Sequence, residues 1–297
     1  MEDILDRNLR EMTEAVRRNE ITSVKLVQGF LDRIEKVNSS LNAVVSINTE
    51  IALKLAAKAD SDLKEGIVHG PLHGIPMTIK DSLDTKDMVT TWGTKGRETF
   101  RPGRDATSVA RLRDAGAILL GKTNTPEFTL SFQTDNLVYG RTNNPYNLEM
   151  TPGGSSGGAA ALIAANAIPF DMGTDTGGSI RLPAHFCGIS GLKPTTGRVP
   201  CTGNALPSSG LIAPLSQVGP LARCVDDLDF LMTIIQGPDL MDPHTVDATE
   251  RSSDDIDVTT LRIGFHTDNG IATPALPIQN AILNAISLLK ANGFKVD

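Results

Sequence analysis

Cysteine, histidine and aromatic residues are scarce in this chain. It has three cysteines and five histidines in 297 residues, and 4% of its residues are aromatic. Cys187, Cys201 and Cys224 form no Cys-x-x-Cys pair, so neither a disulfide framework nor a zinc site is predicted. Scattered cysteines of this kind are typical of reduced thiols, and we therefore expect a cytoplasmic protein.

An excess of positive charge and a long apolar run are also missing. Lysine and arginine number 28 against 35 for aspartate and glutamate, so the net charge is -7. No basic stripe is visible, which argues against direct nucleic-acid binding. The apolar stretch at residues 159–165 is far too short to cross a bilayer, and the acidic residues 1–6 do not resemble a signal peptide. We therefore expect no membrane segment.

Alternating helix and strand patterns predict an α/β fold. Apolar residues recur at helical spacing along residues 1–70, which we expect to form an N-terminal helical segment that packs on the core. Residues 71–297 alternate between short apolar runs and amphipathic stretches, the pattern of strand–helix–strand units. We therefore expect a mixed β-sheet core covered by helices on both faces. The strands are predicted at residues 43–47, 76–80, 88–92, 117–120, 168–172, 261–265 and 294–296, and the helices at residues 2–19, 24–34, 51–63, 105–115, 155–167, 225–235 and 274–292.

Lys80 closes an otherwise apolar run, Gly-Ile-Pro-Met-Thr-Ile-Lys-Asp, at residues 74–81. Burial lowers the pKa of a lysine toward neutrality, so that the amine can accept a proton. The structural alternative is a lysine at the end of a strand that reaches solvent.

Glycine and proline concentrate between residues 150 and 220, where residues 193–220 are predicted to form a loop. Residues 151–158 read Thr-Pro-Gly-Gly-Ser-Ser-Gly-Gly, and residues 173–181 read Gly-Thr-Asp-Thr-Gly-Gly-Ser-Ile-Arg. Glycine lets backbone N–H groups approach a ligand closely, and such groups at a helix start can bind developing negative charge. They would stabilise an oxyanion if Ser179 attacked a carbonyl. A flexible loop and a capped helix start are the structural alternatives.

A serine needs a neighbouring base to act as a nucleophile. None of the five histidines falls in a motif of a histidine base. Lysine replaces histidine in Ser–Lys variants of this chemistry, and a relay through a second serine would let the lysine act at a distance.

These segments resemble the amidase signature family. The resemblance is carried by residues 153–158 and 173–181, by the continuation at residues 183–195, and by Gly-Ile-Pro running into Lys80. Ser155 follows Lys80 by 75 residues and precedes Ser179 by 24. The resemblance covers essentially the whole chain and implies an α/β amide hydrolase with a Ser–Ser–Lys triad.

Within that triad, the resemblance implies that Ser179 is the nucleophile, Ser155 the bridging serine and Lys80 the neutral base. Family members hold the bridging serine through a cis peptide bond, here with Gly154. The implied oxyanion-hole N–H groups belong to Thr176, Gly177, Gly178 and Ser179. The implied supporting residues are Gly154, Ser156, Asp175 and Arg181.

The resemblance also implies what binds. We expect a small-molecule amide substrate, cleaved to a carboxylate and an amine or ammonia through an acyl-enzyme on Ser179. No cofactor or metal is expected, nor direct contact with nucleic acid or membrane, and a homo-oligomer is compatible with the sequence. Family members usually continue well beyond 297 residues, so we expect residues 71–297 to be a core that is incomplete at its C-terminal end.

Three alternatives stay open at this point. The chain would be a glutamine-hydrolysing subunit of a tRNA-dependent amidotransferase, or an inactive truncated fragment. Gly-x-Ser-x-Gly at residues 153–157 also fits the nucleophile elbow of α/β-hydrolases, which requires a strand immediately before it and a histidine base.

Overall fold

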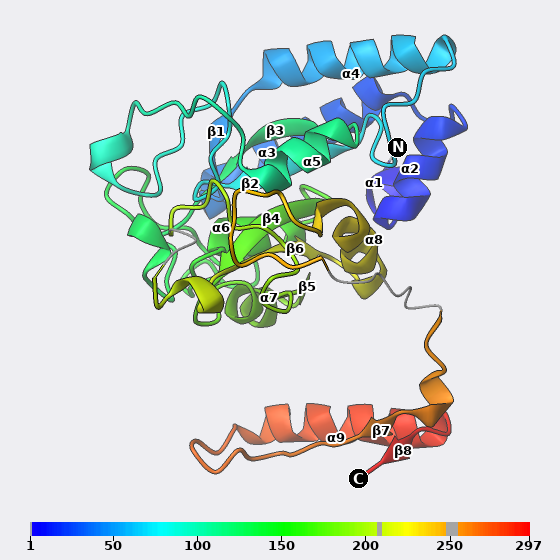
Figure 1. Ribbon diagram of the computed structural model, residues 1–297, viewed down its shortest axis with the longest axis vertical. Helices are drawn as coiled ribbons and strands as arrows, with labels where there is room; N and C mark the ends of the chain where they lie inside the picture. Colours follow the sequence, from blue (N-terminus) through cyan, green and yellow to red (C-terminus); the bar gives the residue numbers. More distant parts are fainter. Residues whose placement is uncertain (1, 207–209, 248–254) are drawn as a thin grey trace. The chain divides into compact units, whose positions relative to one another are not determined.

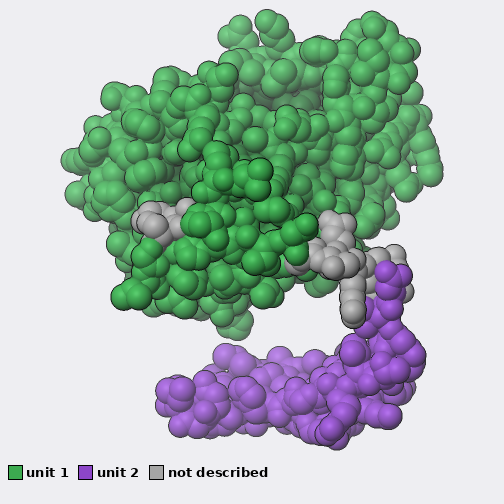
Figure 2. Space-filling view, viewed as in Figure 1, with its two compact units in different colours: residues 1–248 green, residues 249–297 purple. Residues whose placement is uncertain are grey.

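The computed structural model describes residues 2–206, 210–247 and 255–297. Two compact units divide the chain, residues 1–248 and 249–297 (Figure 2). Residues 1–70 lie within the first unit together with most of the α/β region, and a separate segment ending at residue 70 stays a prediction. No helix in the described ranges is both long and apolar enough to cross a membrane.

The first unit begins with four helices, and short polar residues set where they start. The side chain of Asn8 accepts a hydrogen bond from the N–H of Glu11 while the Glu11 side chain accepts one from the N–H of Asn8. This capping box divides the predicted helix at residues 2–19 in two. Thr22 caps the third helix in the same way by accepting from the N–H of Lys25. The helices are α1 (Glu2–Leu5), α2 (Leu9–Arg17), α3 (Ser23–Leu41) and α4 (Thr49–Lys64).

A six-stranded mixed sheet forms the centre of this unit (Figure 1). Its order is β1-β3-β2-β4-β6-β5, in which β2 runs parallel to β3 and β4 while the outer pairs are antiparallel. The expectation of a mixed sheet is confirmed. The strands are β1 (Val44–Ile47), β2 (Pro76–Lys80), β3 (Ile118–Thr123), β4 (Phe170–Asp175), β5 (Ser190–Gly191) and β6 (Gln217–Ala222).

Helices cover both faces of the sheet, as expected. The connections β2–α5–β3 and β3–α6–β4 run in opposite directions along the sheet. Because crossovers between parallel strands are right-handed, α5 and α6 lie on opposite faces. Helix α8 contacts α5, whereas α3 and α7 contact α6. The helices that follow the first strands are α5 (Thr107–Asp114), α6 (Gly157–Ala164), α7 (Arg181–Cys187) and α8 (Val225–Ile235), and the short 3-10 turns are η1 (Lys95–Arg97), η2 (Glu127–Thr129) and η3 (Ala213–Leu215).

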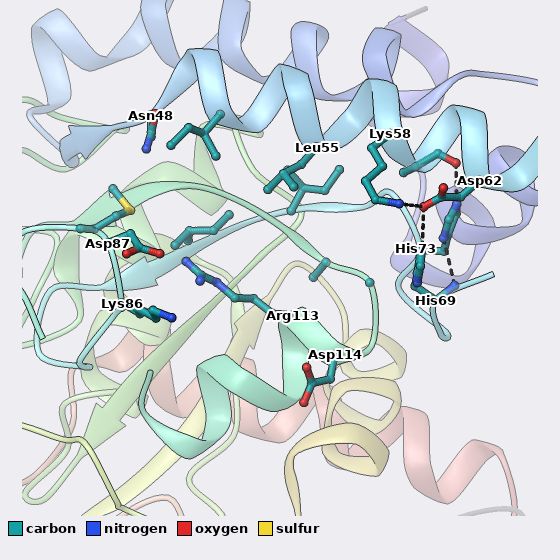
Figure 3. Close-up of a pocket in the computed structure, with 17 residues that line it drawn as sticks. Asn48, Leu55, Lys58, Asp62, His69, His73, Lys86, Asp87, Arg113 and Asp114 are labelled. Atoms are coloured by element: carbon teal, nitrogen blue, oxygen red, sulfur yellow. Dashed lines mark hydrogen bonds and ion pairs between the residues drawn. The ribbon is translucent and has the colours of Figure 1, made fainter. Parts of the chain in front are cut away.

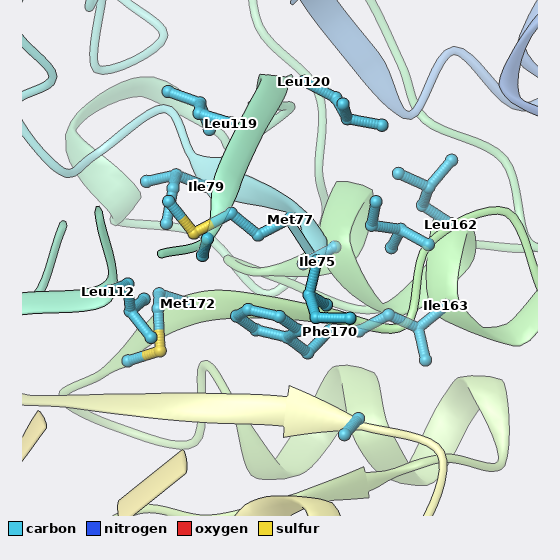
Figure 4. Close-up of a cluster of buried hydrophobic side chains, with 14 of the residues drawn as sticks. Ile75, Met77, Ile79, Leu112, Leu119, Leu120, Leu162, Ile163, Phe170 and Met172 are labelled. Carbon is cyan, nitrogen blue, oxygen red and sulfur yellow. The ribbon is translucent and has the colours of Figure 1, made fainter. Parts of the chain in front are cut away.

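The core is built on the central strands. Every residue of β2, β3, β4 and β6 is buried. Apolar side chains such as Met77, Leu119 and Phe170 fill the space between sheet and helices (Figure 4). Strands buried on both faces are normally apolar throughout. The few charged residues in these strands therefore require partners, and they identify the place where the fold departs from a plain hydrophobic core.

The predicted strand at residues 88–92 is wrong. Two residues at its ends, Asp87 and Trp92, have positive φ angles of 69° and 54°, which interrupt an extended chain. The backbone donors go elsewhere than to a sheet: the N–H of Thr91 donates to the Asp81 side chain at 3.1 Å and that of Trp92 to the Asp81 carbonyl at 3.1 Å. The segment is a loop fastened to the end of β2.

The prediction of a loop throughout residues 193–220 is also wrong at its end. Strand β6 begins at Gln217 and passes through Gly219 and Pro220, two residue types that are poor strand formers. Pro220 has no N–H to contribute, but its carbonyl accepts from the N–H of Leu192 at 3.0 Å. Residues 207–209 of this predicted loop lie outside the described residues.

The second unit contains a helix and two short strands. Strands β7 (Arg262–Ile263) and β8 (Lys295–Val296) pair in parallel, with helix α9 (Leu276–Ala291) between them in sequence and the turn η5 (Val258–Thr260) before them. The predicted helix and both predicted strands are present, the strands shorter than expected. Among the residues described, Ile286 is the buried apolar side chain of this unit.

Candidate active site

Lys80 is the last residue of β2, and its side chain is completely buried. Its Nζ lies 2.6 Å from Ser155 Oγ, 2.9 Å from Ser156 Oγ and 2.8 Å from Thr174 Oγ1. An ammonium group has three donors, so these three hydroxyls satisfy it fully. A neutral amine keeps two donors and a lone pair, and the same contacts then let one hydroxyl donate to nitrogen.

Burial controls the charge of this lysine. Loss of solvent lowers the pKa of Lys80 to about 7, although the negative charges of Asp171 and Asp175 oppose that change. A large fraction of the side chain is therefore an uncharged amine near neutral pH. The alternative of a strand-end lysine that reaches solvent is wrong.

The peptide bond between Gly154 and Ser155 is cis, as the resemblance implies. The backbone at Gly154 is packed so closely that a Cβ there would lie 2.6 Å from the Ser131 carbonyl oxygen. Only glycine fits that position. The Ser155 side chain is fully buried and faces the amine of Lys80.

Ser156 joins the two glycine-rich loops. Its N–H donates to the carbonyl oxygen of Ser179 at 3.1 Å. Its hydroxyl accepts from Lys80 and lies 3.4 Å from the Thr174 carbonyl oxygen. The main chain next to the predicted bridging serine is thus bonded to the main chain of the predicted nucleophile.

Asp175 holds the turn that carries Ser179. The carboxylate accepts from the N–H groups of Gly178 at 2.8 Å and Ile180 at 3.0 Å, and from the Arg181 guanidinium at 2.9 and 3.0 Å. Burial by itself would raise the pKa of Asp175, but these donors outweigh it and lower that pKa to about 2. Asp175 is therefore ionised at neutral pH, and its contacts agree with the predicted loop-holding role of Asp175 and Arg181.

The turn at residues 176–179 presents backbone donors. Within the described ranges, the N–H groups of Thr176, Gly177 and Ser179 have no protein acceptor. Gly178 differs, because its N–H is bonded to Asp175 and its φ angle is 122°, a conformation suited to glycine. Three of the four predicted oxyanion donors are available in this structure, and Gly178 is not.

Ser179 lies at the surface of this cluster, 7% exposed, immediately before α7. Its hydroxyl has no hydrogen-bond partner within the described part of the chain. The structure therefore supplies the contact between Lys80 and Ser155, whereas the transfer between Ser155 and Ser179 stays a prediction.

Two buried residues of β4 were absent from the sequence interpretation. Thr174 binds Lys80, and Asp171 accepts hydrogen bonds from Thr78 at 2.6 Å and Thr123 at 3.0 Å. The signal was present in the sequence, since a carboxylate inside an apolar strand is rarely buried without a partner. The partners themselves depend on strand register, which the pattern does not contain.

The nucleophile-elbow alternative is wrong. Residues 142–152 contain no strand, only an isolated bridge between Asn144 and Asn147. The described hydrogen bonds of the two serine loops, Ser155 and Ser179 included, involve no histidine.

Two of the histidines lie in a separate cavity of about 630 Å³ beside α4 (Figure 3). Asp62 accepts from His69 Nε2 at 2.5 Å and from Lys58 Nζ at 2.6 Å, and the rings of His69 and His73 stack at 5.5 Å. None of the predicted site residues lines this cavity.

A buried lysine bonded to a serine beside a second serine loop, at the end of a mixed sheet, is the arrangement of serine hydrolases that use lysine in place of histidine. The family model described as Amidase matches residues 25–297. The chain belongs to this family, the amidase signature enzymes.

Curated relatives carry the name of a component of a glutamyl-tRNA(Gln) amidotransferase. The chain is 42% identical over 292 residues to the amidotransferase subunit of this name from Roseiflexus sp. (strain RS-1), covering 97% of this chain and 59% of that protein. It is 44% identical over 240 residues to the protein of the same name from Coxiella burnetii (strain Dugway 5J108-111), covering 81% of this chain and 49% of the relative. The chain thus spans about three fifths of the first of these relatives.

Solved structures share the fold. A fatty acid amide hydrolase matches with a TM-score of 0.93 and 29% identity, over 99% of this chain and 52% of that one. The peptide amidase of Stenotrophomonas maltophilia matches with a TM-score of 0.88 and 35% identity, over 98% of this chain and 61% of the other.

Proposed function

We propose that this chain carries the catalytic site of an amide hydrolase, in which Ser179 attacks the carbonyl of a small-molecule amide. The observation that supports this most is the fully buried Lys80, 2.6 Å from Ser155 and able to lose its proton near neutral pH. A serine base that is uncharged in the resting site is what nucleophilic catalysis requires.

The proposed reaction proceeds through an acyl-enzyme. Ser155 passes its hydroxyl hydrogen to neutral Lys80 and takes the hydrogen of Ser179 as the latter bonds to the carbonyl carbon. The N–H groups of Thr176, Gly177 and Ser179 face the oxyanion. The relay then returns a proton to the leaving nitrogen, the C–N bond breaks, and water activated by the same relay releases a carboxylate.

A second candidate is the glutamine-hydrolysing subunit of a tRNA-dependent amidotransferase. It is favoured by the 42% identity, over 97% of the chain, to a protein that carries the name of such a subunit. In this case the amide is glutamine and the partners are other subunits. Glutaminase activity that appears only when partner subunits are added would support this candidate over a free-standing amidase.

We also propose a cytoplasmic location, which the three free cysteines support. No direct contact with nucleic acid is proposed, because the net charge is -7.

Labelling with a fluorophosphonate probe tests the site without knowledge of the substrate. We expect one covalent adduct on Ser179, located by peptide mass spectrometry. Ser179→Ala should abolish it, and Lys80→Ala should slow it by about 10³-fold or more at pH 7.

Ser39→Ala, at an exposed serine on α3, is the matched control and should label at the wild-type rate. Adduct formation that survives Ser179→Ala would contradict the assignment. A folded protein that does not label at all would favour an inactive fragment.

A further inference from the structure

Asp171 is a buried carboxyl that none of the recognised motifs contains. It lies in β4 with no exposed surface. Its Oδ2 accepts from the hydroxyls of Thr78 and Thr123, while its Oδ1 has no hydrogen-bond partner among the described residues. Burying a carboxylate is costly, and a half-satisfied one more so. The position of Asp171 suggests what this cost supports.

The two threonines that hold Asp171 flank the base of the Lys80 side chain. Thr78 precedes Lys80 by two residues in β2, so both point to the same face of the sheet. Thr123 is the direct neighbour of Lys80 in the register of β2 and β3. Asp171 pairs with Thr78 in the register of β2 and β4. The carboxyl therefore lies under the same face, close to the stem of the lysine.

Few other charged groups face Lys80. Asp175 does so from the end of β4, but its oxygens are occupied by Arg181 and backbone N–H groups. Helix α6, which covers this face, reads Gly-Gly-Ala-Ala-Ala-Leu-Ile-Ala and has no titratable side chain. Residues of β6 carry no charge. Lys122 aligns with Ile79 rather than with Lys80, so it points to the opposite face.

Asp81 is adjacent to Lys80 in sequence but serves the other lysine. Its Oδ1 lies 3.9 Å from Lys122 Nζ, and Thr91 donates to its Oδ2 at 2.5 Å. Among the charges that act on the pKa of Lys80, Asp171 is the strongest and Asp81 does not contribute. Burial raises the pKa of Asp171 itself to about 6, so its charge is present above that pH.

We propose that Asp171 is a positioning residue that sets the pH at which Lys80 changes from ammonium to amine, acting through space from the pair of threonines beneath it. This inference rests on the proposed function for its catalytic meaning, because it defines when the relay has a base. It assigns to a residue 91 positions away in sequence the role that the adjacent carboxyl does not perform.

A direct titration of the lysine tests this without any turnover. The protein is labelled with ¹³C at lysine Cε, the Lys80 and Lys122 signals are assigned with K80R and K122R, and both are followed against pH by NMR. D171N keeps an acceptor for the threonine hydroxyls and removes the charge. We expect the Lys80 midpoint to fall by roughly half a pH unit or more, and to move further than that of Lys122.

D81N is the matched control and should give the reverse result, moving Lys122 further than Lys80. An unchanged Lys80 midpoint in D171N, or an equal shift in D81N, would overturn the proposal. If D171N does not fold, T123V is used. It removes one bond that favours the carboxylate, so the Lys80 midpoint should again fall, and a rise or no change would count against Asp171.

The outcome separates this inference from the proposed function. A Lys80 midpoint that falls in D171N supports the role of Asp171 whether or not the protein cleaves amides. If the midpoint falls but the pH dependence of Ser179 labelling does not follow it, the base assignment of Lys80 is what fails.

Discussion

Lys80 shows how one residue in an otherwise apolar strand determines what a site can do. Its three hydroxyl partners suit both the ammonium and the amine, so the protonation change requires only that hydroxyl hydrogens rotate. Removal of solvent brings the pKa of Lys80 to about 7. The same side chain in water would be almost entirely an ammonium at that pH.

The pH dependence of probe labelling follows from this. Because the base form of Lys80 is the deprotonated one and the folded pKa is about 7, the rate of Ser179 labelling should rise with pH, by about tenfold per unit below 7, and level off above it. Stopped-time labelling from pH 5 to 9 measures this. A rate independent of pH across 6 to 8 would be inconsistent with Lys80 as the base.

Thr174 and Asp171 mark the limit of sequence reasoning at this scale. Spacing and residue type identified Lys80, Ser155 and Ser179, because those residues sit in short recognisable segments. The contacts of Thr174 and Asp171 arise from the register of β4 against β2, and register is a property of paired strands.

At the scale of elements, the turn between β4 and α7 is held by one carboxylate. Asp175 gathers donors from the residues on both sides of Ser179, so the turn depends on a charge that is itself buried. Arg181, whose side chain is 57% exposed, completes the pair from the surface.

Asp175→Ala should therefore destabilise the protein by about 2–4 kcal/mol and reduce Ser179 labelling, because several donors lose a charged acceptor. Arg181→Gln should cost less, since water can replace an exposed guanidinium but cannot reach Asp175. Urea denaturation measures both. A larger loss for the arginine variant would contradict this order.

Acid should act on the same contact. The pKa of Asp175 falls from an ordinary 3.8 to about 2 on folding, so its contribution is complete above about pH 4 and is lost as pH falls toward 2.

Element boundaries were predictable where local chemistry decides them. The predicted strand at residues 76–80 and the helix at residues 225–235 match β2 and α8 residue for residue. The two failures, at residues 88–92 and in β6, have one cause. An extended-looking run became a loop because its N–H groups bind Asp81, and a run with Gly219 and Pro220 became a strand because neighbouring strands supply the remaining bonds.

At the scale of the whole molecule, the apolar core belongs to one unit. All the buried apolar side chains described, apart from Ile286, lie before residue 249. The Ser–Lys cluster belongs to that unit too.

A fragment of residues 1–247 should therefore keep a single cooperative urea transition and label at Ser179. Its unfolding free energy should lie within about 2 kcal/mol of that of the 297-residue chain. Loss of the cooperative transition on this truncation would mean that residues 249–297 contribute to the core more than their own burial suggests.

The hydrogen bond from the Ser156 N–H to the Ser179 carbonyl makes the separation of relay and nucleophile a property of the polypeptide backbone. No side-chain replacement can delete it short of proline. Alanine variants of either catalytic serine should consequently keep the shape of the pocket, so any activity they lose reports on chemistry and not on a collapsed scaffold.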